Sequence, residues 1–241
     1  MVERSYCYFR YIIMATLLQI ISTVADMRKA WRRSDDDSLT DRQLAFIINY
    51  YRAKLLEQEA NLGRRMNSNV IQNLGKVSLI KADKNECCEI DNCILRIENP
   101  LPKALDTNRY DLVTYVGLLN GNKSFQRTDV NKVPYDKYAT YTSNQPKWYQ
   151  VSDYIYIVNP PTHLLKYINI KGVFEDPTAA QLYRTCSCPG NDEADCWKGF
   201  DYEYPISITM LDTIYKMMFD AEFKFGNILA QDTTNDTKDD Q

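Results

Sequence analysis

Apolar residues recur at helical spacing in two segments near the N-terminus, and this pattern predicts a pair of helices. The first predicted helix spans about Thr16–Arg33, and its apolar stripe consists of Leu17, Ile20, Ile21, Val24, Met27 and Trp31. The second begins after Thr40, where Gln43 completes a capping box, and Gly63 marks its end. Because only a short polar linker joins them, we expect the two helices to pack antiparallel.

Between residues 70 and 172, short stretches rich in Val, Ile, Tyr and Thr are separated by Asn, Asp, Gly and Pro. Such stretches, bounded by turn residues, are typical of strands. The predicted strands are Lys76–Lys81, Cys93–Glu98, Asp111–Leu118, Tyr149–Tyr156 and Lys166–Ile170. Asn120-Gly121 has the composition of a hairpin turn. This part of the chain is therefore expected to form a β-rich insertion between helices.

Helical spacing returns towards the C-terminus. Asp176 is expected to cap a helix that starts at Pro177. A final helix, about Ser207–Phe225, carries an apolar side and ends at Gly226. Residues 227–241 are polar and acidic and lack such a side, so we expect them to form a flexible tail.

Together these patterns predict an α+β fold. Its body is an antiparallel helical bundle, in which the N-terminal helix pair joins the C-terminal helices, formed by residues 14–69 and 173–226. A β-rich insertion at 70–172 interrupts this bundle. Residues 1–13 form an N-terminal extension, and Met14 is a second candidate for the start of the protein, because the first apolar stripe begins just after it.

Composition and motifs give little support for catalysis. The chain has 29 Lys and Arg against 32 Asp and Glu, a net charge of -3, whereas a dedicated nucleic-acid binder usually has a basic excess. Its single histidine, His163, lies in a turn-like Pro-Pro-Thr-His context. The segment Gly117–Ser124 has some features of a phosphate-binding loop, but Asn122 separates Gly121 from Lys123. We therefore expect no catalytic residue and no cofactor.

The cysteines leave two interpretations open. Apart from Cys7, they form two groups of three: Cys87, Cys88 and Cys93, then Cys186, Cys188 and Cys196. Two groups of thiols can converge on a structural zinc ion, but these spacings match no standard zinc motif. Free thiols in a reducing cytoplasm are the favoured interpretation, so no metal site is predicted.

The N-terminus supports an alternative. Residues 1–25 have the charged start, apolar run and small residues of a signal peptide, whose removal would leave an even number of cysteines for disulfides. The chain would then be a secreted or surface disulfide-linked binding domain. Against this, the apolar helical pattern continues past the expected cleavage site to Trp31. The run is also too short and too interrupted to span a membrane.

Three segments, in a fixed order, resemble the virion ring proteins of crass-like gut phages. The first is Leu39–Leu56, and the second joins Tyr154–Val158 to the stretch Tyr167–Pro177, which ends in Phe-Glu-Asp-Pro. The third is Asp201–Ile206, with Glu-Tyr-Pro-Ile before the final helix. The resemblance extends from Met14 to Phe225, and the chain departs from the family at residues 1–13 and in the Cys186–Cys196 loop.

The resemblance implies a structural role in the virion. The first ring of that family is similar to the head-to-tail adaptors of short-tailed phages, which assemble as a dodecamer under the portal and continue the DNA channel. It thus implies a homo-oligomeric ring, assembled in the host bacterial cytoplasm, that contacts the portal protein and the next tail ring and lets DNA pass without specific binding. The predicted portal anchors are Phe223, Phe225, Ile228 and Leu229. Alternatively, both phenylalanines pack within their own subunit.

Overall fold

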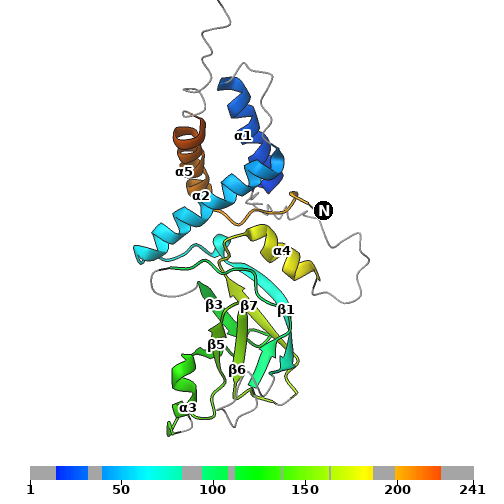
Figure 1. The fold of residues 1–241 in the computed structure, drawn as a ribbon, viewed down its shortest axis with the longest axis vertical. Coiled ribbons are helices and arrows are strands. Elements are labelled where there is room, and N and C mark those ends of the chain that lie inside the picture. Colours follow the sequence, from blue (N-terminus) through cyan, green and yellow to red (C-terminus); the bar gives the residue numbers. More distant parts are fainter. Residues whose placement is uncertain are drawn as a thin grey trace, which may run out of the picture.

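The computed structural model describes residues 15–31, 40–82, 94–107, 112–136, 138–162, 164–186 and 199–223. In this part of the chain, the molecule is elongated, with a seven-stranded sheet at one end and three of the helices at the other (Figure 1). The helices are α1 (Leu17–Trp31), α2 (Asp41–Asn61), α3 (Val133–Asp136), α4 (Pro177–Cys186) and α5 (Ile208–Met218). We refer to residues 72–172, which contain all the strands, as the barrel end, and to α1, α2 and α5 as the helical end.

The sheet curls into a nearly closed barrel. Its strands are β1 (Gln72–Lys81), β2 (Ile94–Ile97), β3 (Val113–Gly117), β4 (Gln126–Arg127), β5 (Lys147–Val151), β6 (Tyr154–Val158) and β7 (Tyr167–Gly172). Their order is β3-β7-β1-β2-β6-β5-β4, and every pair is antiparallel except β4–β5, which is parallel.

The chain between β3 and β4 brings the two edges of the sheet together. The Phe125 N–H donates to the Val116 carbonyl at 2.8 Å, and Gly117 bridges to Ser124. Gly117 leaves no room for a Cβ against the Lys123 carbonyl, so a larger residue would push these segments apart. The turn between them contains Gly121 at φ +74°, which confirms the predicted hairpin turn.

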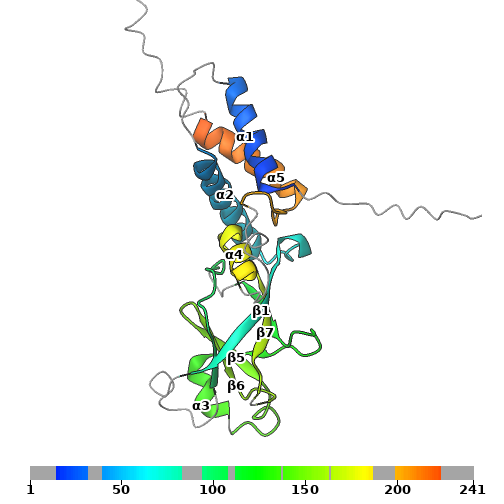
Figure 2. The same ribbon diagram turned by 90° about the vertical axis from the view of Figure 1, so that its right-hand side faces the viewer.

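Alternating residues of the strands fill the barrel interior. The side chains that contact one another there include Leu74, Val77, Leu95, Ile97, Val116, Phe125, Trp148, Ile155, Ile157, Ile168 and Ile170. Helix α4 lies between the barrel and the helical end, and it adds Ala180 to this interior cluster (Figure 2). The burial of aliphatic and aromatic side chains, at about 25 cal/mol per Å² of apolar surface, drives the formation of this region.

The helical end has a separate core. Leu17, Ile20, Ile21 and Val24 of α1 pack with Leu44, Ile48, Ile214 and Met218 of α2 and α5. The predicted capping box of α2 is confirmed: Thr40 accepts from the Gln43 N–H, and the Gln43 side chain accepts from the Thr40 N–H at 2.9 Å. Gly63, at φ +70°, directly follows the C-cap as expected.

The predicted fold class, an antiparallel helical bundle with a β-rich insertion, is wrong. The sheet is a nearly closed barrel with its own interior, rather than an insertion that depends on helices for a core. Helix α4, which was expected to join the bundle, instead packs on this barrel through Ala180. The prediction failed because helical periodicity shows which face of a helix is buried but does not show whether a helix or a sheet covers that face.

The prediction of one strand over Tyr149–Tyr156 is also wrong, because the structure has two strands there. β5 and β6 form a hairpin that closes at the Val151–Tyr154 pair, and Ser152 in the turn has φ +52°. The turn residues Ser152 and Asp153 lie inside a stretch otherwise rich in Val, Ile and Tyr, and without a glycine the turn signal is weak.

Candidate functional site: a cleft at the open edge of the barrel

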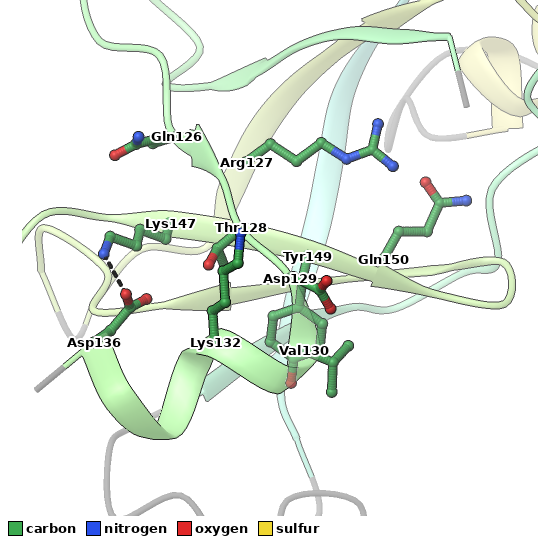
Figure 3. A pocket seen from close by; sticks show the side chains of 10 residues that line it. All are labelled: Gln126, Arg127, Thr128, Asp129, Val130, Lys132, Asp136, Lys147, Tyr149 and Gln150. Atoms are coloured by element: carbon green, nitrogen blue, oxygen red, sulfur yellow. Dashed lines mark ion pairs between the residues drawn. The ribbon is translucent and has the colours of Figure 1, made fainter. Parts of the chain in front are cut away.

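A cleft of about 510 Å³ lies where β4 separates from β5 (Figure 3). The chain leaves the sheet after Arg127 and forms a short 3₁₀ turn, Val130–Lys132, and then α3. One wall of the cleft is this segment and the other is β5. The lining residues are Gln126, Arg127, Thr128, Asp129, Val130, Lys132, Asp136, Lys147, Tyr149 and Gln150.

Local contacts fix the segment over the sheet. The Asp129 side chain accepts from the Asn131 N–H and caps the 3₁₀ turn. Val133 is buried against Tyr149 and Tyr156, whose rings stack with centroids 5.1 Å apart. This small apolar cluster on the outside of the barrel places α3 beside β5, so that Asp136 faces Lys147.

Lys147 and Asp136 form a buried ion pair in the cleft wall. Lys147 Nζ lies 2.8 Å from Asp136 Oδ1, and Lys147 is only 5% exposed. The second carboxylate oxygen, Oδ2, is buried without a hydrogen-bond partner, and so is Gln150 Oε1. Buried polar atoms are nearly always paired in folded proteins, so two unpaired acceptors beside one cleft form an unusual local feature.

Exposed tyrosines occur in and after the segment that forms one wall of the cleft. The segment from the 3₁₀ turn onwards exposes Tyr135, Tyr138 and Tyr141, and the side chain of Tyr135 is 70% exposed. Val130, in the cleft lining, is partly exposed as well. Tyrosine is enriched at protein interfaces because its ring is apolar and its hydroxyl remains hydrated or bonded.

The chemistry of the cleft suits a protein partner. Its charged groups are Arg127, Lys132 and Lys147 against Asp129 and Asp136, and its lining contains neither histidine nor cysteine. Over the described ranges, no group of three His, Cys, Asp or Glu side chains is placed to hold a metal ion. Mixed charges and backbone at a strand edge are groups that recognise polypeptide.

A second polar site links the helical end to Phe174, which directly follows the barrel end in sequence and packs in the barrel interior. Arg52 of α2 is fully buried; its Nε donates to the Pro205 carbonyl and its Nη1 to the Phe174 carbonyl, both at 2.9 Å. Its guanidinium carbon lies 5.8 Å from the centre of the Tyr204 ring. Burial lowers the pKa of Arg52, and the nearby tyrosines and Asp176 partly oppose this shift.

Further hydrogen bonds extend the site around Arg52. The Tyr204 hydroxyl donates to Asn49 Oδ1 at 2.7 Å, and Asn49 Nδ2 donates to Asp176 Oδ1 at 3.1 Å. Asp176 also accepts from the Thr178 N–H, as the predicted cap of α4. The hydroxyls of Thr178 and Tyr202 lie 3.0 Å apart. Burial raises the pKa of Tyr202 to about 12 and raises that of Tyr204 further.

This buried junction brings together the three segments on which the family resemblance depends. Asn49 and Arg52 come from the first segment, and the stretch ending in Phe-Glu-Asp-Pro supplies Phe174 and Asp176. The stretch ending in Glu-Tyr-Pro-Ile supplies Tyr204 and Pro205. The resemblance therefore reflects, at least here, residues that hold the two ends of the molecule together.

The structure does not test the predicted portal anchors. Phe223 is the last residue of a π-helical turn, Phe219–Phe223, which continues α5, whereas Phe225, Ile228 and Leu229 lie outside the described residues. His163 and the cysteine groups also lie outside them, except that Cys186 ends α4. Sequence reasoning missed Arg52, Lys147 and Asp136. The burial of Lys147 could have been suspected from its position, because it directly precedes Trp148 and Tyr149 at the start of an apolar strand.

Comparison with known proteins identifies a family. None of the helices within the described ranges is long and apolar enough to span a membrane. No curated protein matches the chain. The family model for phage tail ring protein 2 (CrAss_Ring_2) matches residues 19–241, which include both ends of the molecule and the junction between them. This confirms the resemblance to the ring proteins of crass-like phages, and the chain belongs to the phage tail ring protein 2 family.

Proposed function

We propose that the protein is a non-catalytic ring subunit of the head-to-tail connector, which docks below the portal and continues the DNA channel. The family match is the observation that carries this proposal, because it makes the chain a structural component of a phage tail. The match also favours this role over that of a secreted, disulfide-linked binding domain. A closed ring requires two different side surfaces on each subunit, in addition to surfaces towards its neighbours along the tail.

In this proposal, the helical end faces the portal. The final helix α5 leads into Phe223, and the anchors Phe223, Phe225, Ile228 and Leu229 become ordered on the portal. The same end exposes two aromatic residues one turn apart on α2, Phe46 at 72% and Tyr50 at 55%. The exposed tyrosines of the barrel end, Tyr135, Tyr138 and Tyr141, face the next ring protein or a neighbouring subunit.

The charge of the chain supports passage of DNA without specific binding. Each lysine or arginine that neutralises a phosphate strengthens binding through the release of counterions. A chain with a net charge of -3 cannot present a basic channel wall in every copy without a compensating acidic surface elsewhere. A dodecamer, the stoichiometry implied by adaptors of short-tailed phages, would have a net charge twelve times larger.

The test combines the full chain with the purified portal protein of the same phage. We expect native mass spectrometry to detect a ring of about twelve copies, and co-sedimentation to show that the ring binds the portal. A chain that lacks residues 227–241 is the matched variant, and we expect it to fold without joining the portal. Normal attachment of this shortened chain would leave the tail without the docking role.

A further experiment tests the position of the ring along the tail. The full chain is mixed with another ring protein of the same phage, first without and then with the portal. A ring that binds the portal alone supports direct docking. A ring that joins the portal only when the other ring protein is present would contradict direct docking, although the structural ring role would remain.

A further inference from the structure

The barrel has an unpaired strand edge beside the cleft. β6 pairs with β5 along its whole length, from Lys147 to Val151. On the other side, β4 pairs only with Lys147 and Trp148. Beyond them, no strand in the described part of the chain covers this edge of β5. An uncovered edge is a template for another extended segment.

The orientation of the backbone identifies the residue that offers this edge. The Thr128 N–H donates to the Trp148 carbonyl at 2.8 Å, so the backbone groups of Trp148 point away from β6. Because these groups alternate along a strand, those of Tyr149 point towards β6 and those of Gln150 point towards the cleft. Gln150 therefore presents both an N–H and a carbonyl to an incoming segment.

The unpaired side-chain acceptors of the cleft residues are less accessible than the backbone of this edge. Asp136 Oδ2 and Gln150 Oε1 are buried acceptors without partners, and both belong to residues that line the cleft. Both oxygens are buried and out of reach of an incoming segment, so the backbone of Gln150 is the group that this edge offers. Figure 3 shows Gln150 and Asp136 on opposite sides of the lined space, with Lys132 between them.

We propose that an extended segment of a neighbouring copy of this chain occupies the cleft and pairs with β5 at Gln150. This inference rests on the ring assembly of the proposed function. In a ring, each copy has a neighbour in one fixed orientation, so a free edge and its partner segment meet in every subunit. An edge left open in every copy would otherwise invite irregular pairing.

Two substitutions of Gln150 distinguish pairing through its backbone from a role of its side chain. Gln150→Pro removes the outward N–H but no bond to β6, and proline is tolerated on strand edges. Gln150→Ala keeps the N–H and removes the side chain. At equal protein concentration, we expect native mass spectrometry to show a decrease in rings of about tenfold or more for Gln150→Pro and little change for Gln150→Ala. Rings at the wild-type level from folded Gln150→Pro would overturn the proposal.

Hydrogen exchange of the wild-type chain provides a second test that does not depend on the folding of a variant. We expect the Gln150 amide to exchange about tenfold or more slowly in rings than in subunits separated by dilution. The Tyr149 amide, which faces β6, serves as the internal control and stays protected in both states. Equal exchange of the Gln150 amide in rings and subunits would refute the pairing.

These outcomes also separate the inference from the function on which it rests. If the wild-type chain forms no ring either alone or with the portal, the ring assembly of the proposed function fails. If the ring forms and Gln150 remains unprotected within it, only the cleft proposal fails. Protection of Gln150 that arises only when the portal or another ring protein is added would assign the cleft to a different protein and contradict occupation by a second copy.

Discussion

The barrel end and the helical end are stabilised in different ways. Backbone ladders close the barrel almost completely, and its interior is apolar. The helical end has its own apolar core, and it is attached to the remaining chain by buried hydrogen bonds around Arg52 and by a small apolar cluster that includes Leu56, Leu105 and Leu112. We therefore expect a substitution at the junction to weaken the attachment of the helices more than a substitution on a strand does.

The largest effect is expected from Arg52→Ala. The change leaves the Phe174 and Pro205 carbonyls without their donor in a buried site and creates a cavity, so we expect a loss of about 3–5 kcal/mol in unfolding free energy. Urea unfolding followed by circular dichroism measures this loss. Hydrogen exchange should show faster opening at Ile48 of α2 than at Ile155 of the barrel.

Arg64→Ala is the matched control for Arg52→Ala. Arg64 pairs with Glu59 at 2.9 Å near the end of α2, but 63% of its side chain is exposed. Exposed ion pairs contribute little to stability, so this variant should unfold like the wild-type chain. Equal opening of Ile48 and Ile155 in Arg52→Ala would show that the two ends unfold as one unit.

A smaller loss is expected from Lys147→Met at the barrel end. Removal of the ammonium leaves the Asp136 carboxylate partly buried with neither oxygen paired, and broken buried ion pairs typically cost about 3 kcal/mol. The double variant Lys147→Met/Asp136→Leu should recover most of this loss, because no charge is then left unpaired. Chemical denaturation measures all three chains.

The pair Lys103–Glu175 is the exposed counterpart in the same protein. Its atoms lie 3.0 Å apart, and the Lys103 side chain is 72% exposed. Lys103→Met should leave the unfolding curve nearly unchanged. A similar loss for Lys103→Met and Lys147→Met would contradict the importance we give to burial at the cleft.

Local features of the fold could be predicted from the sequence, whereas the overall arrangement could not. The Thr40–Gln43 cap and the Asn120-Gly121 turn depend on neighbouring residues, and both are confirmed. Barrel closure depends on the Phe125–Val116 hydrogen bond and on a parallel pairing of only two residue pairs, Gln126–Lys147 and Arg127–Trp148. A pair so short and so distant in sequence has no periodic signal.

The Arg52 site and the Lys147–Asp136 ion pair could not be predicted from the sequence for a related reason. Arg52 follows Tyr50-Tyr51 on a helix that looked amphipathic, and its burial depends on two carbonyls more than 100 residues away in sequence. The ion pair of the cleft joins Asp136 to Lys147 across an irregular loop. Family resemblance pointed to the junction segments, although it assigned no role to any of their residues.

The junction should also respond to alkaline pH. Burial raises the pKa of Tyr202 to about 12 from an ordinary value of 10.0, so the unfolded chain releases this proton first. The stability due to neutral Tyr202 is present below pH 10 and is lost as pH rises towards 12, by about 1.4 kcal/mol at pH 11. Denaturation at pH 8 and pH 11 measures this loss.

Tyr202→Phe should make the loss of stability between pH 8 and pH 11 smaller. At pH 8 the variant should be less stable by about 1 kcal/mol, because the contact between the hydroxyls of Tyr202 and Thr178 is absent. An unchanged difference between pH 8 and pH 11 would rule out Tyr202 as a source of the alkaline sensitivity. Tyr204 remains in the variant and retains its own contribution.

The smallest effect on stability is expected from substitution of the exposed aromatic residues. The same substitutions should also show the clearest difference in portal binding between the helical end and the barrel end. Phe46 and Tyr50 lie on the side of α2 opposite Leu44 and Ile48, which face the core. Phe46→Ser/Tyr50→Ser should change the unfolding free energy by less than about 1 kcal/mol, because neither side chain is buried. We expect this chain to form rings but to bind the portal weakly in co-sedimentation.

Tyr141→Ser, at the 91% exposed tyrosine of the barrel end, should leave portal binding unchanged. Equal portal binding by both variants would show that Phe46 and Tyr50 do not contact the portal.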